Sequence, residues 1–315
     1  MDMFFSVLDA TLRVSTPLVL AALAGLFSER SGIVDLALEG KMLAAAFASA
    51  CVAYLAHSPW AGLGAGIAAG VLVALLHGGV SISYNGNQLI SAVAINMMVS
   101  GVTPVLALAW FQQGGRTPTL DDSERFTALP MPFADAIEQS SALKLIFGHN
   151  ILVYIAVAVI FVVSWVMYKS RFGLRLRAVG ENPHAADAAG ISVKSVRYIA
   201  QAISGALCGV AGTYLALAQT GAFIQDMTAG KGYLALAALI FGKWRPWAAV
   251  SGCLLFAFTD AIQIRLQGVE LPLIGSIPDA FIQAIPYVLT VVLLAGLMGR
   301  AVAPKAIGIP FVKSR

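Results

Sequence analysis

Nine apolar stretches, most of them about as long as a membrane crossing, dominate the sequence. A helix needs about 20 predominantly apolar residues to span the hydrocarbon core of a bilayer. Hydrophobic residues make up 59% of the 315 residues and charged residues only 11%, whereas a typical soluble domain carries about 25% charged residues. Because one soluble core cannot bury so much apolar surface, the sequence predicts an all-α, polytopic membrane bundle of about 8–10 transmembrane or broken helices. The stretches lie at 11–28, 33–57, 61–80, 88–111, 150–168, 196–218, 229–242, 247–265 and 279–299.

Two of these stretches differ from a simple crossing. The stretch at 229–242 is short, and the stretch at 33–57 begins with a polar, glycine-containing lead. Short or interrupted apolar segments are typical of the broken helices that surround a transport site. The sequence therefore predicts two broken segments beside a solute path.

Glycine recurs at steps of four residues in two other stretches. Gly62, Gly66 and Gly70 do so in the first, and Gly205 and Gly209 in the second. In lipid, small residues on one helix face let two backbones approach closely. These glycines therefore predict packing seams, although the alternative is that glycine is simply common in membrane helices.

Two polar loops indicate the orientation of the chain. Residues 112–149 form a long link rich in proline and acidic residues, whereas residues 169–197 carry six Lys or Arg against two acidic residues. Because cytosolic loops are enriched in Lys and Arg, we expect 169–197 in the cytosol and 112–149 outside. The side of Met1 stays open: four simple crossings before 112–149 place it outside, and a re-entrant segment places it inside.

Several function classes find no support in the sequence. The net charge is +4, but no basic helix face or aromatic platform for nucleic acid accompanies it. The chain has no GxxxxGKS/T phosphate loop, no HExxH and no GxSxG motif. Cys51, Cys208 and Cys253 lie singly in apolar runs, which favours small core residues over metal ligands or disulfides. Nothing here indicates an enzyme or a metal site.

Acidic residues in the apolar stretches are candidates for the solute path, because an ionised group at the bilayer centre costs about 2.5–3.5 kcal/mol. Asp35 and Glu39 are four residues apart, so in one helix they would share a face. A basic neighbour such as Arg30 or Lys41 would relieve their repulsion.

Amide side chains open the stretch at 88–111. Asn87 and Gln88 lie at its start and Asn96 lies inside it, where buried amides can bind a sugar hydroxyl or a base edge. The alternatives are helix capping by Asn87 and an interhelical hydrogen bond by Asn96. Asp226 and Lys231 flank the start of the short stretch, and their alternative role is to pair with each other.

The run from Gly180 to Ile191 lies inside the basic loop. Asn182-Pro183 predicts a turn and a helix start, and Gly190 predicts the end of that helix. Small outward-facing residues in such a loop suit docking into a groove of another protein, and the alternative is an ordinary connector. The small residues are Ala185, Ala186, Ala188 and Ala189.

The same run resembles the coupling loop of the permease family of ABC importers for branched-chain amino acids, simple sugars and nucleosides. The family pattern G-x-N-x-x-A-A-x-x-A-G-I-x-V is matched from Gly180 to Val193. Two more runs, 29–40 and 230–238, resemble this family in order and spacing, and look closest to its nucleoside and simple-sugar branch. One departure is Lys41, where we would expect an apolar residue. The resemblance covers about residues 14–300.

This resemblance implies a single permease domain over 1–315, similar to type II ABC importers, in a bacterial inner membrane. It implies a second permease chain, an ATP-binding subunit that uses ATP and Mg²⁺, and an external substrate-binding (lipo)protein. No cofactor is expected in this chain. The second permease is expected to be non-identical, since nucleoside-type members typically combine two unlike permeases. In a pair of identical chains, two copies of Asp35 and Glu39 would also lie near one axis, where their negative charges would repel each other in a low dielectric.

The expected function is a non-catalytic permease subunit of an importer, with a nucleoside as the expected solute and a simple sugar or branched-chain amino acid as alternatives. An alternative of another class is a self-sufficient ion-coupled transporter using Asp35, Glu39 or Asp260, but the docking loop favours the permease. The residues expected along the solute path are Asp35, Glu39, Asn87, Gln88, Asn96, Asp226, Lys231 and Tyr233. The residues expected to couple to the ATP-binding subunit are Glu181, Asn182, Ala185, Ala186, Asp187 and Gly190.

Overall fold

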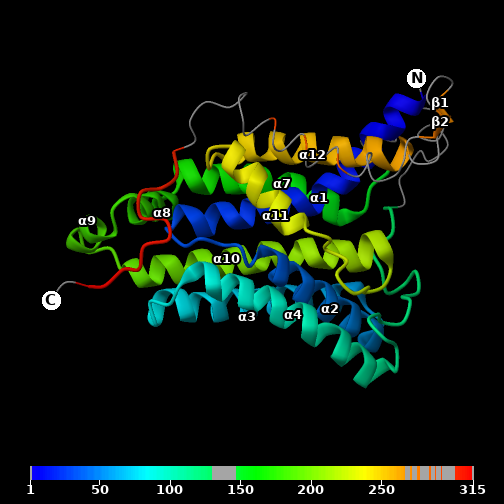
Figure 1. Cartoon of the computed structure of the whole chain (residues 1–315), viewed down its shortest axis with the longest axis horizontal. Helices are drawn as coiled ribbons and strands as arrows, with labels where there is room; N and C mark the ends of the chain where they lie inside the picture. The colour runs from blue at the N-terminus through cyan, green and yellow to red at the C-terminus, as the bar shows by residue number, and fades with distance from the viewer. Residues whose placement is uncertain are drawn as a thin grey trace.

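The computed structural model describes residues 2–129, 147–266, 270–271, 275–276 and 302–313, and the single positions 284, 288 and 292. These residues are predominantly helical, which confirms the all-α prediction (Figure 1). The long helices are α1 (Asp2–Arg30), α2 (Leu38–Ala56), α3 (Pro59–Gly78), α4 (Gln88–Phe111), α7 (Ile151–Lys169), α10 (Val193–Thr213) and α12 (Pro246–Leu266). The short elements are α8 (Arg171–Glu181), α9 (Pro183–Ala188), α11 (Lys231–Phe241), the π-helical turns η1 (Gly79–Ser83) and η2 (Tyr214–Thr220), and the antiparallel strands β1 (Glu270–Leu271) and β2 (Gly275–Ser276).

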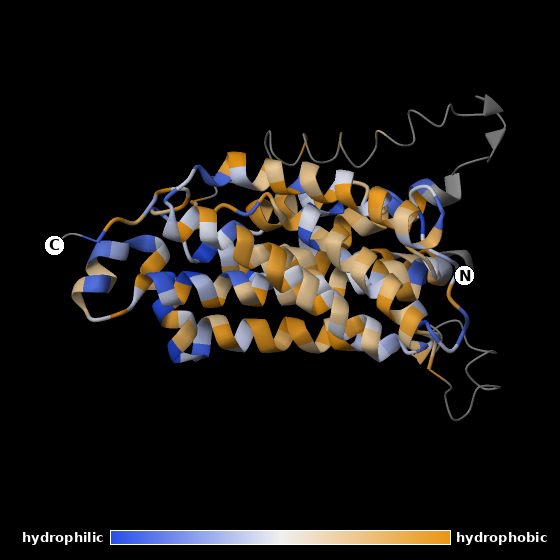
Figure 2. Cartoon of the chain, turned by 90° about the horizontal axis from the view of Figure 1, so that it is seen from below, coloured by the Kyte–Doolittle hydropathy of each residue, from blue (hydrophilic) through white to orange (hydrophobic). Residues whose placement is uncertain are grey.

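Six helical segments in the described part of the chain are long and apolar enough to cross a membrane. Figure 2 shows hydrophobic residues along the middle of the bundle and hydrophilic residues gathered toward its two ends. The chain is therefore a multi-pass membrane protein, as the stretches predicted. The predicted stretch at 279–299 lies outside the described residues except for three single positions. The six segments are Phe5–Arg30, Leu38–Ala56, Pro59–Ser83, Gln88–Phe111, Ile151–Lys169 and Val193–Thr220.

Helix α1 is the central element of the bundle. It packs against α7, α10, α11 and α12, and Leu18, Leu20, Leu23 and Leu26 have no exposed surface. A helix that is apolar around its whole circumference belongs in an interior. Helix α10 packs on α1 and joins it to α2 and α3, while α4 packs on α2. The outer faces of α4 and α7 are exposed.

Helices α3 and α10 pack through the predicted glycine seam. A Cβ atom added to Gly70 would lie 2.3 Å from the carbonyl oxygen of Gly205, and one added to Gly209 would lie 2.5 Å from the Cα of Ile67. No side chain fits at such distances, so the backbones are in direct contact. The expectation of a seam is confirmed.

The two ends of the bundle carry different loops. At one end the Arg30 guanidinium donates to the Trp244 carbonyl (3.0 and 2.8 Å) near α8. At the other end the Tyr214 hydroxyl donates to the Arg13 carbonyl (3.0 Å), and His57 at the end of α2 contacts Glu124. The start of α1 therefore lies at the same end as residues 112–129, with four segments running between the ends before that loop (Figure 1). This arrangement agrees with the alternative of four crossings before 112–149.

Residues 31–37 are not helical, although residues 33–37 lie inside a predicted apolar stretch. After α1 the chain turns back and runs along the bundle to the start of α2 at Leu38 (Figure 1). Unpaired backbone groups are costly at membrane depth, and side chains satisfy them here. Gln88 Oε1 accepts from the Val34 N–H (2.7 Å), His77 Nε2 bonds the Val34 carbonyl (3.1 Å), and Asn96 Nδ2 donates to the Leu36 carbonyl (2.9 Å). The prediction of a broken segment is confirmed.

The C-terminal residues 302–313 lie at the end that carries α8 and α9. The Ala306 N–H donates to the Gly180 carbonyl (2.9 Å), and the Gly308 N–H donates to the Gly32 carbonyl (3.1 Å). Phe311 is buried in the main hydrophobic core. The tail therefore contacts both the short helices and the non-helical lead to α2.

Candidate transport site

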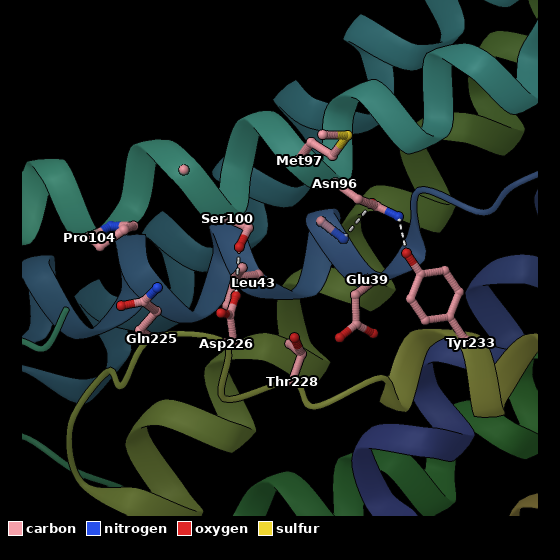
Figure 3. A pocket seen from close by; sticks show the side chains of 12 residues that line it. Glu39, Leu43, Asn96, Met97, Ser100, Pro104, Gln225, Asp226, Thr228 and Tyr233 are labelled. Atoms are coloured by element: carbon pink, nitrogen blue, oxygen red, sulfur yellow. Dashed lines mark hydrogen bonds between the residues drawn. The ribbon is translucent and has the colours of Figure 1, made fainter. Parts of the chain in front are cut away.

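A cavity of about 580 Å³ lies level with the middle of α4. Its walls come from the first turns of α2, from α4, and from the segment that leads into α11 (Figure 3). The two segments predicted to be broken, 33–57 and 229–242, therefore both contribute to its walls. The lining residues are Glu39, Gly40, Leu43, Asn96, Met97, Ser100, Gly101, Pro104, Gln225, Asp226, Thr228 and Tyr233.

Glu39 connects the starts of α2 and α11. Its Oε1 accepts from the Gly230 N–H (2.8 Å) and its Oε2 from the Gly232 N–H (2.7 Å). The first N–H groups of a helix have no intrahelical partner and carry partial positive charge, which a carboxylate stabilises. A Cβ added to Gly232 would lie 2.5 Å from the Glu39 nitrogen, so glycine is required for this contact.

Asn96 makes a second set of bonds in the wall of the cavity. Its Oδ1 accepts from the Gly40 N–H (2.9 Å), and its Nδ2 donates to the Leu36 carbonyl (2.9 Å) and the Tyr233 hydroxyl (2.8 Å) (Figure 3). These bonds join α4, the start of α2 and α11. The alternative of an interhelical hydrogen bond therefore holds, although Asn96 also lines the cavity.

Asp226 lies at the open side of the cavity. Its Oδ1 accepts from the Ser100 hydroxyl (2.7 Å), which links α4 to the segment before α11 (Figure 3). In the described part of the chain no ion pair joins Asp226 to Lys231, so the structure does not support the alternative in which these two residues pair.

Asp35 lies away from the cavity, in a buried polar cluster between α2 and α10. The Lys41 ammonium donates to Asp35 Oδ2 (2.6 Å) and to Gln201 Oε1 (3.0 Å), and the Ser204 hydroxyl also donates to Asp35 (3.0 Å). Because α2 begins after Asp35, Asp35 and Glu39 do not share a helix face, and that expectation is wrong. Lys41 does relieve the charge of Asp35, as one of the two expected partners.

Four of the eight predicted path residues line the cavity: Glu39, Asn96, Asp226 and Tyr233. Of the others, Asn87 caps α4 by accepting from the Leu89 and Ile90 N–H groups (3.0 and 3.1 Å), which is the capping alternative. Gln88 accepts a hydrogen bond from the Val34 N–H in the non-helical segment before α2. The lining residues that the sequence analysis missed are Gly40, Leu43, Met97, Ser100, Gly101, Pro104, Gln225 and Thr228. Polar and small residues inside the apolar run of α4 were the available signal.

The predicted coupling residues lie on α8, α9 and the turn after α9 (Figure 1). Asn182 caps α9 by accepting from the Ala185 N–H (3.0 Å), and Gly190 has φ +80° at the turn that ends it. Ala186 is buried against this chain's own core, so the expectation that it faces outward is wrong. The exposed coupling residues are Glu181, Asn182, Ala185 and Gly190, while Asp187 is half-buried beside Lys313.

Comparison with known proteins gives one matching family. Residues 7–298 match the model of the branched-chain amino acid transport system / permease component family. This match covers both broken segments, the cavity and the two short helices.

The curated relatives are permeases over nearly their whole length. The chain is 38% identical to the guanosine ABC transporter permease protein NupQ of Bacillus subtilis, covering 98% of this chain and 97% of the relative. It is 36% identical to the nucleoside ABC transporter permease protein NupC of Lactococcus lactis (96% and 95% covered). It is 35% identical to the putative glucose ABC transporter permease protein TsgC13 of Haloferax volcanii (87% and 81% covered).

A second Bacillus subtilis relative is more distant. The guanosine ABC transporter permease protein NupP is 28% identical, covering 87% of this chain and 77% of the relative. NupQ and NupP are thus two guanosine permease proteins of one organism that differ in their similarity to this chain.

Proposed function

Because this chain belongs to the branched-chain amino acid transport system / permease component family, we propose that the cavity beside α4 is part of its solute path and that the solute is a nucleoside. The chain is a multi-pass, non-catalytic permease subunit of an ABC importer, as its relatives are ABC transporter permeases over nearly their full length. ATP hydrolysis belongs to a separate subunit.

The chemistry of the cavity carries the proposal. Asp226, Ser100, Gln225 and Thr228 offer carboxylate, hydroxyl and amide groups for the hydroxyls of a ribose. The ring of Tyr233, which is half exposed, offers a flat apolar face for a base. A volume of about 580 Å³ lies within the usual range of small-molecule sites. The names of NupQ and NupC support the same solute class.

A simple sugar is the second candidate solute. The relative TsgC13 is described as a putative glucose permease and is nearly as similar as the nucleoside permeases. The hydroxyl-binding groups of the cavity suit a sugar equally well. The aromatic face of Tyr233 and the apolar side chain of Met97 favour a solute that carries a flat base.

A second permease is the proposed cover for the open side of this cavity. Asp226 and Gln225 are exposed, and Met97 is 72% exposed beside them. Polar groups facing lipid at membrane depth are costly, whereas groups facing a protein partner or a water-filled path are not. The pair of guanosine permeases in Bacillus subtilis supports a non-identical partner.

The rest of the assembly follows the family. The proposal places the chain in a bacterial inner membrane with 112–149 outside and α8 and α9 in the cytosol. There, exposed Glu181, Asn182, Ala185 and Gly190 contact an ATP-binding subunit that uses ATP and Mg²⁺. An external substrate-binding protein delivers the solute.

The test compares two glycines that both have room for a side chain. A Cβ at Gly101, in the cavity wall, or at Gly64, on the outer face of α3, meets no atom within 4 Å. We expect Gly101→Trp to fill the cavity and lower guanosine uptake more than tenfold in proteoliposomes holding the complete complex, because the ring occupies the path. Gly64→Trp serves as the control and retains uptake near the unsubstituted level.

Two results would contradict the proposal. Equal uptake by the two tryptophan variants would remove the cavity from the path. Uptake of glucose or leucine without guanosine, measured with the cognate binding protein, would exclude the nucleoside and favour an alternative solute. Co-purification of the other subunits with both variants is measured in parallel, so that a failure of assembly is recognised.

A further inference from the structure

The charges around the cavity have one sign. Among its described lining residues are two carboxylates, Glu39 and Asp226, and no Lys, Arg or His. Lys41 pairs with buried Asp35. On the loop side, Arg116 lies opposite Ile224, two residues from Asp226, but it is not among the described residues that line the cavity. The described lining of the cavity therefore carries a net negative charge.

The two carboxylates contribute unequally. Glu39 accepts two N–H bonds from the start of α11, and a helix N-terminus carries the equivalent of about half a positive charge. Asp226 is exposed at the open side, and its described partner is the neutral hydroxyl of Ser100. Asp226 is thus the less compensated charge, and apolar walls such as Leu43 and Pro104 strengthen its field.

We propose that the cavity filters solutes by charge, with Asp226 as the specificity-determining residue that admits uncharged and cationic solutes and rejects anions. A phosphorylated solute carries about −1.5 to −2 charges at neutral pH, so a nucleoside passes and its phosphate ester does not. This inference rests on the proposed function, because it concerns the same cavity. It adds a criterion that the permease applies independently of the external binding protein.

The test measures the field directly with thiol reagents of different charge. Gly101→Cys places a thiol in the cavity without a clash, in a background where Cys51, Cys208 and Cys253, all buried, are replaced by serine or alanine. The assembled complex in liposomes is treated with cationic, anionic and neutral methanethiosulfonates of similar size. After correction for their reactivity with free 2-mercaptoethanol, the cationic reagent should react at least tenfold faster than the anionic one.

Substitution of the carboxylates identifies the source of the field. We expect Asp226→Asn to lower the ratio of cationic to anionic rates on the order of tenfold, because removal of one charge changes the two rates in opposite directions. Asp122→Asn is the control: this carboxylate is exposed in the loop after α4 and does not line the cavity, so the ratio should stay as it was.

Three outcomes would overturn the inference. One is a ratio near unity in the assembled complex, which would mean that a partner chain neutralises the carboxylates. Another is an equal effect of Asp226→Asn and Asp122→Asn. The third is a thiol that reacts with none of the reagents, because the cavity would then not be aqueous. Guanosine uptake by the same liposomes separates the cases: normal uptake with a ratio near unity removes the filter and leaves the proposed function standing.

Discussion

At the scale of single residues, the chain contains two kinds of ionisable group near the start of α2. Some form a buried ion pair that holds helices together, and others face the cavity. The side chains of Lys41 and Asp35 are both fully buried, with 2.6 Å between Nζ and Oδ2. Gln201 and Ser204 of α10 supply further hydrogen bonds to the pair. A buried pair so surrounded fixes the start of α2 against α10, whereas Glu39, two residues from Lys41, faces the cavity and α11.

The first prediction concerns this pair. Asp35→Leu leaves the Lys41 ammonium buried without its counter-ion, and removing one member of a buried pair costs about 3–5 kcal/mol. We expect a large fall in the midpoint of thermal unfolding of the purified complex. The double variant Asp35→Leu, Lys41→Met removes both charges and should recover most of that stability. A single variant as stable as the unsubstituted complex would contradict the structural role and return Asp35 to the solute path.

Sequence reasoning found the candidate site only in part, and the residues explain why. The broken segments identified Glu39 and Tyr233 because short or interrupted stretches have a physical meaning in lipid. Asp35 could not be told from Glu39, because spacing alone assigned both to one helix that in fact begins at Leu38. Gln225 gave no sequence signal of its own, and the polar Ser100 inside the apolar run of α4 did not show which element it faces. The position of both residues in the wall depends on the packing of α4 against the segment before α11.

At the scale of elements, the short helices α8 and α9 are supported by the C-terminal tail. Phe311 is buried with its ring 5.2 Å from that of His184 in α9. The Nζ atom of Lys313 lies 3.7 Å from Oδ1 of Asp187. The same tail bonds the lead to α2 through Gly308 and Gly32. A continuous set of contacts therefore runs from α8 and α9, which we propose contact the ATP-binding subunit, to the non-helical lead to α2, whose first turns form part of the cavity wall.

The second prediction tests this support. Phe311→Ala removes the buried ring, and loss of a buried aromatic side chain costs about 3–5 kcal/mol. We expect solute uptake to fall several-fold while ATP hydrolysis by the assembled complex continues, because α9 loses the contact that holds its position. Ile309→Ala is the control, since Ile309 belongs to the same tail and is 55% exposed. Equal uptake by the two variants would show that the tail does not contribute to coupling.

The lengths of the elements could be predicted, whereas the path of the chain between them could not. Hydropathy identified α3, α4 and α7 nearly to their ends, because a crossing must bury about 20 apolar residues. It joined residues 33–37 to α2, since apolar composition does not distinguish a helix from an extended segment whose backbone is satisfied by Gln88, His77 and Asn96. Those side chains come from α3 and α4, so the information lies in the tertiary structure.

At the scale of the whole molecule, the charge argument for a non-identical partner changes. Two copies of this chain would not bring bare Asp35 groups together, because Lys41 neutralises each one. They would bring two copies of Asp226 to a shared path, since Asp226 lies on the open side of the cavity. Repulsion between them in low dielectric is the remaining physical reason to favour an unlike permease.

The last prediction concerns the orientation of the whole bundle. Arg13 and residues 112–129 lie at one end of it, and α8, α9 and the C-terminal tail lie at the other. With the basic loop in the cytosol, an epitope tag before Met1 should be reached by antibody on intact spheroplasts. In a cysteine-free background, a thiol at exposed Ser123 should react with an impermeant reagent from outside, and one at exposed Ser192 only after permeabilisation. A tag reached only after permeabilisation, with Ser123→Cys labelled from outside, would contradict the number of crossings. Reversal of all three signals would leave the fold intact and invert its orientation, because the three positions are fixed relative to one another by the bundle.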